Sequence, residues 1–165
     1  MAEKLLIDYT IRSGSTKDFA LLVKFMQRTY QDMFGRQDFS HLSQTVGQYL
    51  SPDTPLWWVE HSAQKKEQVD IDIFPTRPIA CLWMGNAIDQ ISGLRHAHIF
   101  LLYVTPSHRR KGIGTALMQY AENWAKQRGD NQIALQVFQT NTPALNLYNQ
   151  LGYQIQSLWM IKPLQ

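Results

Sequence analysis

Cysteine and long apolar runs are scarce in this sequence, and each scarcity excludes a class of protein. Cys81 is the only cysteine among 165 residues, so neither an internal disulfide nor a C-x-x-C metal or redox pair can form. The longest uninterrupted apolar run, residues 99–104, has six residues, whereas a membrane-spanning helix needs about 20. The run before Asp8 is shorter than the core of a signal peptide. We therefore expect a soluble, cytoplasmic protein that does not span a membrane.

Internal repeats, low-complexity tracts and linker-like stretches are also absent. With 44% hydrophobic positions, a chain of this length buries roughly 70% of its unfolded surface in one core and needs no metal or disulfide to fold. The sequence therefore predicts a single domain over residues 1–165.

The basic charge is concentrated in the second half of the chain. Residues 1–91 contain nine Lys and Arg against eleven Asp and Glu, and residues 92–165 contain seven against two, so the two halves carry net charges of −2 and +5. Such an imbalance indicates an anionic partner for the second half: a nucleic acid, a phosphate-bearing cofactor or a membrane surface. Ordinary scatter of surface charge produces the same numbers and remains an alternative.

Hydrophobic periodicity predicts alternating strands and helices. Ser15 and Asp18 resemble a capping box at the start of the first helix, and Thr142 with Pro143 resembles the start of the last one. Residues 78–84 and 96–104, joined by a short turn, should pair antiparallel. We interpret residues 62–77 as a surface excursion of uncertain form. The pattern predicts a mixed, partly antiparallel α/β sheet with helices on both faces: strands at 5–12, 56–59, 78–84, 96–104, 133–138 and 153–161, and helices at 15–30, 39–50, 112–128 and 142–151.

The most informative segment joins a predicted strand to a predicted helix and carries two glycines, Gly112 and Gly114. Glycine allows the backbone to approach a ligand, and the first amides of the helix lack intrahelical partners, so the segment suits a diphosphate. The helix dipole adds roughly 0.3 to 1 kcal/mol per nearby negative charge. Three basic residues raise the local positive charge further: Arg109, Arg110 and Lys111.

Two common phosphate loops do not fit this segment. A Walker loop needs lysine after its last glycine, but Lys111 precedes Gly112. A dinucleotide fingerprint needs a small residue at position 117, which is leucine, and an acidic residue at the end of the next strand, which is absent. What remains is Arg109-x-x-Gly112-x-Gly114, which resembles the coenzyme A pyrophosphate motif of the GNAT superfamily of N-acetyltransferases. The resemblance continues through a second motif between Leu135 and Tyr153, and it covers residues 100–153.

The resemblance implies a GNAT-type α/β (α+β) fold: a mostly antiparallel sheet of six to seven strands, helices on both faces, and a fourth and fifth strand that splay apart. It implies that acetyl-CoA lies between those two strands, and it implies no metal. By resemblance, the pantetheine arm would pair with the strand edge and the pyrophosphate would sit on the glycine loop. The implied cofactor-binding residues are Leu102, Tyr103, Val104, Arg109, Arg110, Lys111, Gly112, Ile113, Gly114, Thr115, Asn141, Ala144 and Tyr148.

Two side chains are candidates for catalysis. By resemblance, Tyr148 would lie near the thioester sulfur and protonate the departing thiolate, with Ala144 one turn earlier leaving the path open. A lysine-like amine needs about 4.6 kcal/mol to expose its lone pair at pH 7, so a base should help. Alignment of the fourth strand places His98 where several histone acetyltransferases of the superfamily carry a glutamate base. His96, His98 and His108 could instead suggest a metal, but no carboxylate or cysteine completes the set.

These observations predict transfer of an acetyl group from acetyl-CoA to a primary amine of a small molecule or peptide, by direct attack within a ternary complex. Cys81 has no basic neighbour in sequence, which disfavours a covalent acyl-cysteine. The alternatives are an acetyl-CoA sensor without turnover and a nucleic-acid-binding module, of which nucleic acid is the disfavoured partner. The sequence leaves a homodimer open. Aromatic candidates for walls of the acceptor pocket are Tyr30, Phe34, Trp57, Trp58 and Trp83.

Overall fold

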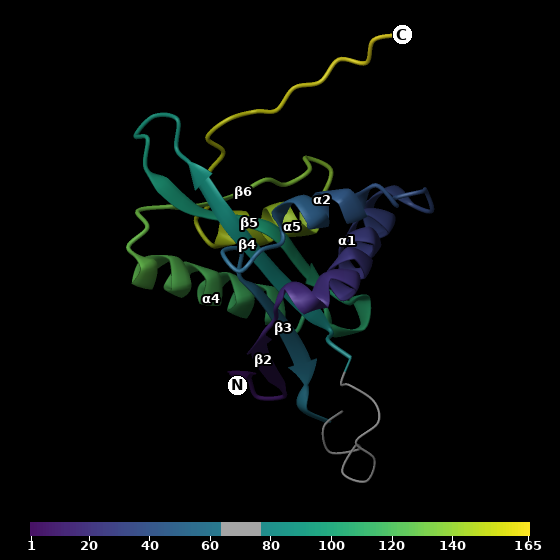
Figure 1. Cartoon of the computed structure of the whole chain (residues 1–165), viewed down its shortest axis with the longest axis vertical. Coiled ribbons are helices and arrows are strands. Elements are labelled where there is room, and N and C mark those ends of the chain that lie inside the picture. The colour runs from purple at the N-terminus through teal and green to yellow at the C-terminus, as the bar shows by residue number, and fades with distance from the viewer. Residues whose placement is uncertain (64–76) are drawn as a thin grey trace.

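The computed structural model describes residues 1–63 and 77–165 and shows a six-stranded sheet in the order β1 to β6 (Figure 1). Neighbouring strands pair antiparallel except β5 and β6, which are parallel. The parallel pair follows from its connection, because a helix carries the chain back across the sheet between these two strands. The strands are β1 (Ala2–Leu6), β2 (Tyr9–Ser13), β3 (Leu56–His61), β4 (Ala80–Ile88), β5 (Arg95–Val104) and β6 (Ile133–Leu135).

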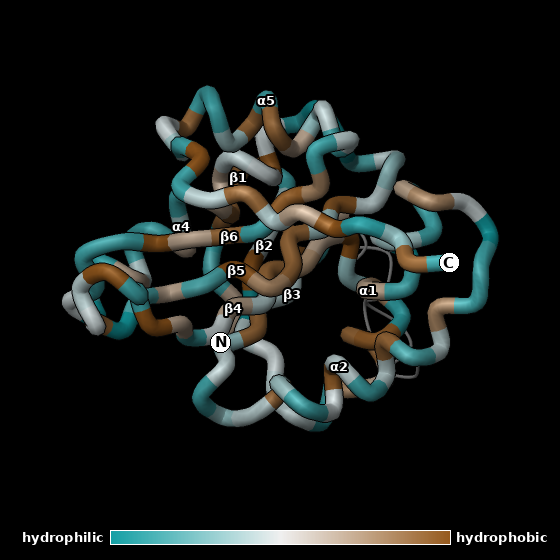
Figure 2. Tube along the Cα trace, turned by 90° about the horizontal axis from the view of Figure 1, so that it is seen from above, coloured by the Kyte–Doolittle hydropathy of each residue, from teal (hydrophilic) through white to brown (hydrophobic). Residues whose placement is uncertain are grey.

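Helices cover both faces of the sheet, as predicted. In Figure 2, α4 (Ile113–Arg128) and α5 (Thr142–Gln150) lie on one side of the strands, and α1 (Phe19–Phe34) and α2 (Leu42–Tyr49) lie on the other. Each side forms its own apolar cluster, because side chains alternate along every strand. The confirmed fold class is a mixed, mostly antiparallel α/β sheet. Among the described residues, no helix has the length and apolar character needed to cross a membrane.

The first predicted strand, residues 5–12, is in fact a hairpin of β1 and β2. Leu6 pairs with Tyr9 around a tight turn, and Ile7 in that turn is 84% exposed. An apolar residue at the turn hid the reversal from the hydrophobic pattern. The predicted capping box is present: the Ser15 hydroxyl accepts from the backbone of the turn, and the Asp18 carboxylate accepts from the Ser15 amide. It caps a 3-10 turn (Thr16–Asp18) that leads into α1. Most of the surface excursion expected at residues 62–77 lies outside the described residues.

The strand predicted at residues 153–161 is wrong. After Gly152 the chain leaves the body in an extended form, without strand pairing among the described residues, and runs to the end marked C in Figure 1. Its apolar side chains are exposed. The segment has the composition of a strand, but a strand also needs a neighbouring edge to pair with, and residues 1–63 and 77–152 place none beside it. The strand predicted at 133–138 is likewise shorter, since β6 ends at Leu135.

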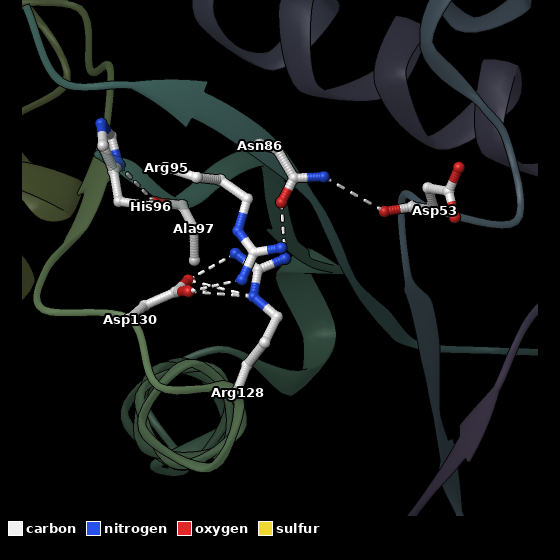
Figure 3. Close-up of polar contacts among 7 residues, drawn as sticks. All are labelled: Asp53, Asn86, Arg95, His96, Ala97, Arg128 and Asp130. Atoms are coloured by element: carbon white, nitrogen blue, oxygen red, sulfur yellow. Dashed lines mark hydrogen bonds and ion pairs between the residues drawn. The ribbon is translucent and has the colours of Figure 1, made fainter. Parts of the chain in front are cut away.

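A buried carboxylate fastens the end of α4 to the hairpin of β4 and β5 (Figure 3). Asp130 pairs with Arg128 at the end of the helix and with Arg95 at the start of β5, and its side chain is 1% exposed. Arg128 also contacts Asn86 of β4 and stacks 4.4 Å over the ring of Trp124. These contacts, called the Asp130 clamp here, hold the last turn of α4 against the hairpin. The orientation of α4 in turn sets where its first residue lies.

Candidate cofactor and active site

β5 loses its neighbour on one side partway along its length. Its parallel pairing with β6 ends at Ile99 and Leu135, although β5 continues to Val104. On the other side, the register with β4 shifts so that Phe100 is an extra residue between Ile99 and Leu101. Such a bulge bends a strand and increases its twist. Residues 100–104 therefore present a backbone edge that β6 does not cover, which is consistent with the splay that the family resemblance implies.

A 3-10 turn (Pro106–His108) connects this edge to the glycine loop, residues 109–114, at the start of α4. Gly112 is the residue before the helix and has a φ of +81°, and Arg110 has a φ of +63°. Left-handed residues alternating with ordinary ones turn successive backbone amides toward one side, which makes an anion-binding concavity. The first bond accepted by Gly112 comes from the amide of Ala116 at 3.0 Å, so the amides of Ile113 and the next two residues precede the helical ladder.

The space over this loop is open. A Cβ built at Gly112 would meet no atom within 4 Å, so the glycine is needed for its backbone conformation and not for packing. At Gly114 a Cβ would lie 3.3 Å from Leu147 of α5, which shows how closely α5 packs beside the loop. Gly112 is therefore exposed at the start of α4, and α5 packs beside Gly114.

The basic residues of the loop divide into two groups. Arg110 and Lys111 are exposed and form no ion pair within residues 1–63 and 77–165, so their charge is available to a ligand. Arg109 is also exposed, but its guanidinium already has a carboxylate partner within the protein. Of the residues that could form a nucleic-acid patch, Arg109 pairs with Asp32 and Arg128 pairs with Asp130. Neutralisation of these two weakens the nucleic-acid alternative.

Asp32 of α1 is a site residue that the sequence reasoning missed. Its carboxylate accepts from the Arg109 guanidinium at 2.8 Å and from the Tyr103 hydroxyl at 2.9 Å. The Arg109 Nε also donates to the carbonyl of Val104 at 2.8 Å. Burial, followed by the bond to Asp32, raises the pKa of Tyr103 to about 12. Asp32 therefore ties α1 to the end of β5 and the start of the glycine loop.

Asn141 is the N-cap of α5, a position that the sequence analysis gave to Thr142. Its side-chain oxygen accepts from the amide of Ala144 at 3.4 Å. Its amide nitrogen lies 3.6 Å from the sulfur of Met33 in α1. Asn141 thus links the start of α5 to α1. Its role as the N-cap of α5 is enough by itself to explain an asparagine at this position.

Tyr148 lies on α5 in a half-buried position against the α4 side of the sheet. Its ring centre is 5.9 Å from that of Tyr153. Burial raises the pKa of Tyr148 to about 12, so the phenol remains protonated throughout the neutral range. Ala144 stands one turn earlier and adds no side chain beyond Cβ. The hydroxyl is a permanent hydrogen-bond donor, although its raised pKa makes complete proton release harder than for an ordinary tyrosine.

His98 lies on β5 just before the bulge, opposite Gly85 of β4 and Ala134 of β6. Its ring centre is 5.7 Å from that of Phe100. Burial and then the neighbouring His96 lower the pKa of His98 below its ordinary value of 6.5. The imidazole is therefore neutral at pH 7 and able to accept a proton.

The three histidines do not gather into one group. His96 is buried with its Nδ1 3.0 Å from the carbonyl oxygen of Ala97. His108 instead lies by the glycine loop, with its Nδ1 2.9 Å from the Tyr9 hydroxyl and its ring centre 5.3 Å from that of His61. Within the described ranges, no three His, Cys, Asp or Glu side chains are arranged to hold a metal.

The proposed aromatic walls separate into core and rim. Trp58 and Trp83 are buried in the α1 and α2 cluster, and Trp57 packs on the opposite face against Tyr120 and Trp124. Tyr30 and Phe34 at the end of α1 remain as rim residues. Both contact Phe138, at centre distances of 5.9 Å and 5.0 Å. Phe138 lies in the segment after β6, so this aromatic group connects the end of α1 to the region where β6 no longer pairs with β5.

Comparison with known proteins decides the family. A match to the acetyltransferase (GNAT) family covers residues 23–153. The chain belongs to the GNAT family. This confirms the resemblance that rested on the Arg109-x-x-Gly112-x-Gly114 motif and on residues 135–153, and it extends the similarity back into α1.

Relatives of this GNAT chain include N-acetyltransferase family 8 member 3 of Rattus norvegicus, 30% identical over 134 residues, which are 81% of this chain and 52% of the rat protein. A streptothricin acetyltransferase of Streptomyces lavendulae is 42% identical over 50 residues, 30% of this chain and 26% of that protein. A peptidyl-lysine N-acetyltransferase of Escherichia coli is 34% identical over 71 residues, 43% of this chain and 45% of that protein. The chain thus spans about a quarter to a half of these curated relatives.

Solved structures share the GNAT fold over nearly the whole chain. A ribosomal-protein-alanine N-acetyltransferase from Brucella melitensis superimposes with a TM-score of 0.66 at 16% identity, covering 95% of this chain and 99% of that one. An aminoglycoside acetyltransferase from an uncultured soil sample gives 0.65 at 15% identity, covering 98% of this chain and 100% of that one. At these identities the likeness confirms the fold.

Proposed function

We propose that this protein is an acetyl-CoA-dependent N-acetyltransferase that acts on a primary amine. One observation carries the proposal: the edge of β5 that β6 leaves unpaired is followed, after one 3-10 turn at Pro106–His108, by the glycine loop, in which Arg110 and Gly112 have left-handed backbone conformations. Coenzyme A combines a long arm with amide groups and a diphosphate. A free strand edge and a cradle of helix amides are complementary to these two parts in that order.

The residues present fit this ligand. Gly112, Ile113, Gly114 and Thr115 would supply amides to the diphosphate, with added charge from Arg110 and Lys111. The edge formed by Leu102, Tyr103 and Val104 would pair with the pantetheine arm through backbone groups. Arg109 would stabilise the site indirectly, through its ion pair with Asp32 and its hydrogen bond to the Val104 carbonyl. Asn141 and Ala144 would border the arm at the start of α5.

The transfer itself needs a base, an oxyanion donor and a donor for sulfur. His98, neutral at pH 7, would accept the proton that the amine nitrogen releases as its bond to the acetyl carbon forms. A backbone amide near Val104 would stabilise the thioester oxygen, and one such donor is typically worth about 2.7 to 4 kcal/mol. Tyr148 would donate to the sulfur as the carbon–sulfur bond breaks. The products are the acetylated amine and the free thiol.

Burial of Cys81 supports direct transfer over a covalent acyl-cysteine. The side chain is fully buried in β4, and burial raises its pKa well above the ordinary range. A thiol held in this way is neither accessible nor ionised, and a nucleophilic cysteine needs both properties.

A panel of amines assayed for thiol release from acetyl-CoA tests the proposal. The names of the relatives suggest three acceptors for the panel: streptothricin, lysine in a peptide and alanine in a ribosomal protein. Turnover with one acceptor, reduced roughly 100-fold in kcat by Tyr148→Phe, is the expected result. Tyr120→Phe is the matched control, since this phenol lies on α4 and bonds to Glu3.

The sensor alternative predicts a different outcome. Saturable binding of acetyl-CoA with no thiol release from any amine would support a sensor and contradict the enzyme. Binding that is abolished by moderate salt and shows no preference for coenzyme A would contradict both and indicate a nucleic-acid surface.

A further inference from the structure

Four ring-bearing side chains meet on the α1 and α2 side of the sheet, beside the bulge in β5. The ring centre of Phe100 lies 4.9 Å from that of Trp83, 5.5 Å from that of Tyr49 and 5.7 Å from that of His98. All three distances fall in the range where aromatic rings attract one another. Trp83 is buried, whereas Tyr49, the last residue of α2, is 46% exposed. These residues, called the Phe100 cluster here, therefore reach from the sheet to the surface.

Gly85 of β4 sets the position of the Phe100 ring. Gly85 lies opposite His98 in the ladder between β4 and β5. A Cβ built at Gly85 would overlap the Phe100 ring, so this ring packs directly against the backbone of β4. Glycine weakens a strand and often marks a close approach to its backbone. The strand therefore accommodates an aromatic ring that remains half-buried and open to contact on the surface side.

The Phe100 cluster lies where the reacting end of the cofactor is expected. In the proposed function the diphosphate binds the glycine loop, and the arm follows the edge of β5 from Val104 to Leu102. The same direction along the strand leads next to the bulge at Phe100 and then to His98. An acceptor amine that meets the thioester there has its carbon skeleton against the Phe100 cluster.

The surroundings of His98 favour a substrate that carries little charge. Burial and then His96 lower the pKa of His98, and among the described residues no carboxylate contributes to that shift. Asp130, which is buried beside the same hairpin, is already paired with Arg95 and Arg128. A second ammonium group brought into such a site loses its water without gaining a partner. The site therefore suits an acceptor whose only positive charge is the reacting amine.

We infer that the acceptor is an arylalkylamine, a primary amine joined by a short carbon chain to one flat ring. The ring packs against Phe100 and Tyr49, and the amine reaches His98. A two-carbon chain places the nitrogen about 5 Å from the centre of its ring, close to the 5.7 Å that separates the ring centres of Phe100 and His98. The inference rests on the proposed acetyl transfer and adds the class of its substrate.

Steady-state kinetics with three amines test the inference. 2-Phenylethylamine has a flat ring and one charge, 2-cyclohexylethylamine has a puckered ring and one charge, and spermidine has several charges and no ring. The kcat/KM for 2-phenylethylamine, measured as thiol release from acetyl-CoA, should exceed that for 2-cyclohexylethylamine roughly 3- to 10-fold. It should exceed that for spermidine roughly 100-fold.

The outcomes separate this inference from the proposed function. Equal or reversed values for the flat and puckered rings would overturn the inference and leave acetyl transfer standing. Release only with spermidine or with the other acceptors of the panel would do the same. Thiol release with no amine at all would overturn both.

The exposed wall of the Phe100 cluster provides a matched pair of variants. Tyr49→Ser removes a ring that is 46% exposed at the end of α2, and Phe19→Ser removes one that is 39% exposed at the start of α1. Tyr49→Ser should raise the KM for 2-phenylethylamine roughly 10-fold and leave kcat and the dissociation constant of acetyl-CoA unchanged. Tyr49→Phe should restore the KM, and Phe19→Ser should not change it.

Phe100→Leu gives a second reading at the centre of the Phe100 cluster. It keeps an apolar side chain but removes the flat ring, so the preference for 2-phenylethylamine over 2-cyclohexylethylamine should disappear. Circular dichroism checks that each variant is folded, and the Phe100→Leu result decides if Tyr49→Ser is not. A KM that Tyr49→Ser leaves unchanged, or that both serine variants raise equally, would overturn the inference.

Discussion

Substitution of Gly112 can distinguish a loss of ligand binding from the backbone strain that any side chain causes at a left-handed position. It lies at the start of α4 with a φ of +81°, and Gly129 lies at the other end of the same helix with a φ of +89°. A Cβ at either position meets no atom within 4 Å. Alanine at each should therefore cost the same left-handed strain, about 1–2 kcal/mol. For a chain of this size that lowers the melting temperature by about 2–8 °C.

Only Gly112→Ala should also weaken coenzyme A binding. Relief of the strain rotates the amides at the start of α4 away from the diphosphate, and each lost bond to a charged group costs about 1.5–3 kcal/mol. Calorimetric titration with coenzyme A should give a dissociation constant roughly 10- to 100-fold higher for Gly112→Ala and unchanged for Gly129→Ala. Equal affinities for the two variants, with matched melting temperatures, would refute the assignment of the loop.

Substitutions at three further positions test the proposed base, the helix cap and the buried ion pair. Because the pKa of His98 lies below 6.5, the acid limb of kcat should have its midpoint below that pH, and His98→Gln should remove the limb; a limb unchanged by the substitution would exclude His98 as the base. Asn141→Ala should lower the free energy of unfolding by about 1 kcal/mol, while Asn141→Asp, which keeps the capping oxygen, should restore stability but not coenzyme A affinity. Burial opposes ionisation of Asp130, but Arg128 and Arg95 together lower its pKa below 3.8. Its stabilisation is therefore present above the unfolded pKa and lost as pH falls through the lower folded value. Asp130→Asn should lower the free energy of unfolding by about 1–3 kcal/mol at pH 7. It should also weaken the acid-pH dependence of that free energy, measured by urea denaturation, and an unchanged dependence would contradict the role given to Asp130.

The parts of the fold that the sequence predicted well are those with strong local patterns. The α4 helix, the glycines at its two ends and β5 were all identified close to their observed bounds. These features depend on periodicity and on backbone conformations that glycine alone adopts easily. The glycine loop was recognisable for the same reason, because the chemistry of a diphosphate site is carried by adjacent residues.

Features that depend on contacts between distant residues could not be predicted. Asp32 and Arg109 are 77 positions apart, and nothing near Asp32 distinguishes it from the other polar residues of α1. The bulge at Phe100 and the divergence of β6 depend on how β5 meets both of its neighbours. Residues 153–161 show the converse limit, since their strand-like composition predicts a pairing that the described residues do not make.

Backbone amide chemical shifts measured during a titration with coenzyme A test whether the glycine loop and the edge of β5 bind this ligand. Saturable shifts are expected that are largest at Gly112, Ile113 and Gly114 and that continue along Leu102 to Val104, with little change at Gly129. Saturable binding that perturbs other amides and leaves the glycine loop unmoved would contradict this assignment, and so would the absence of any shift at millimolar coenzyme A.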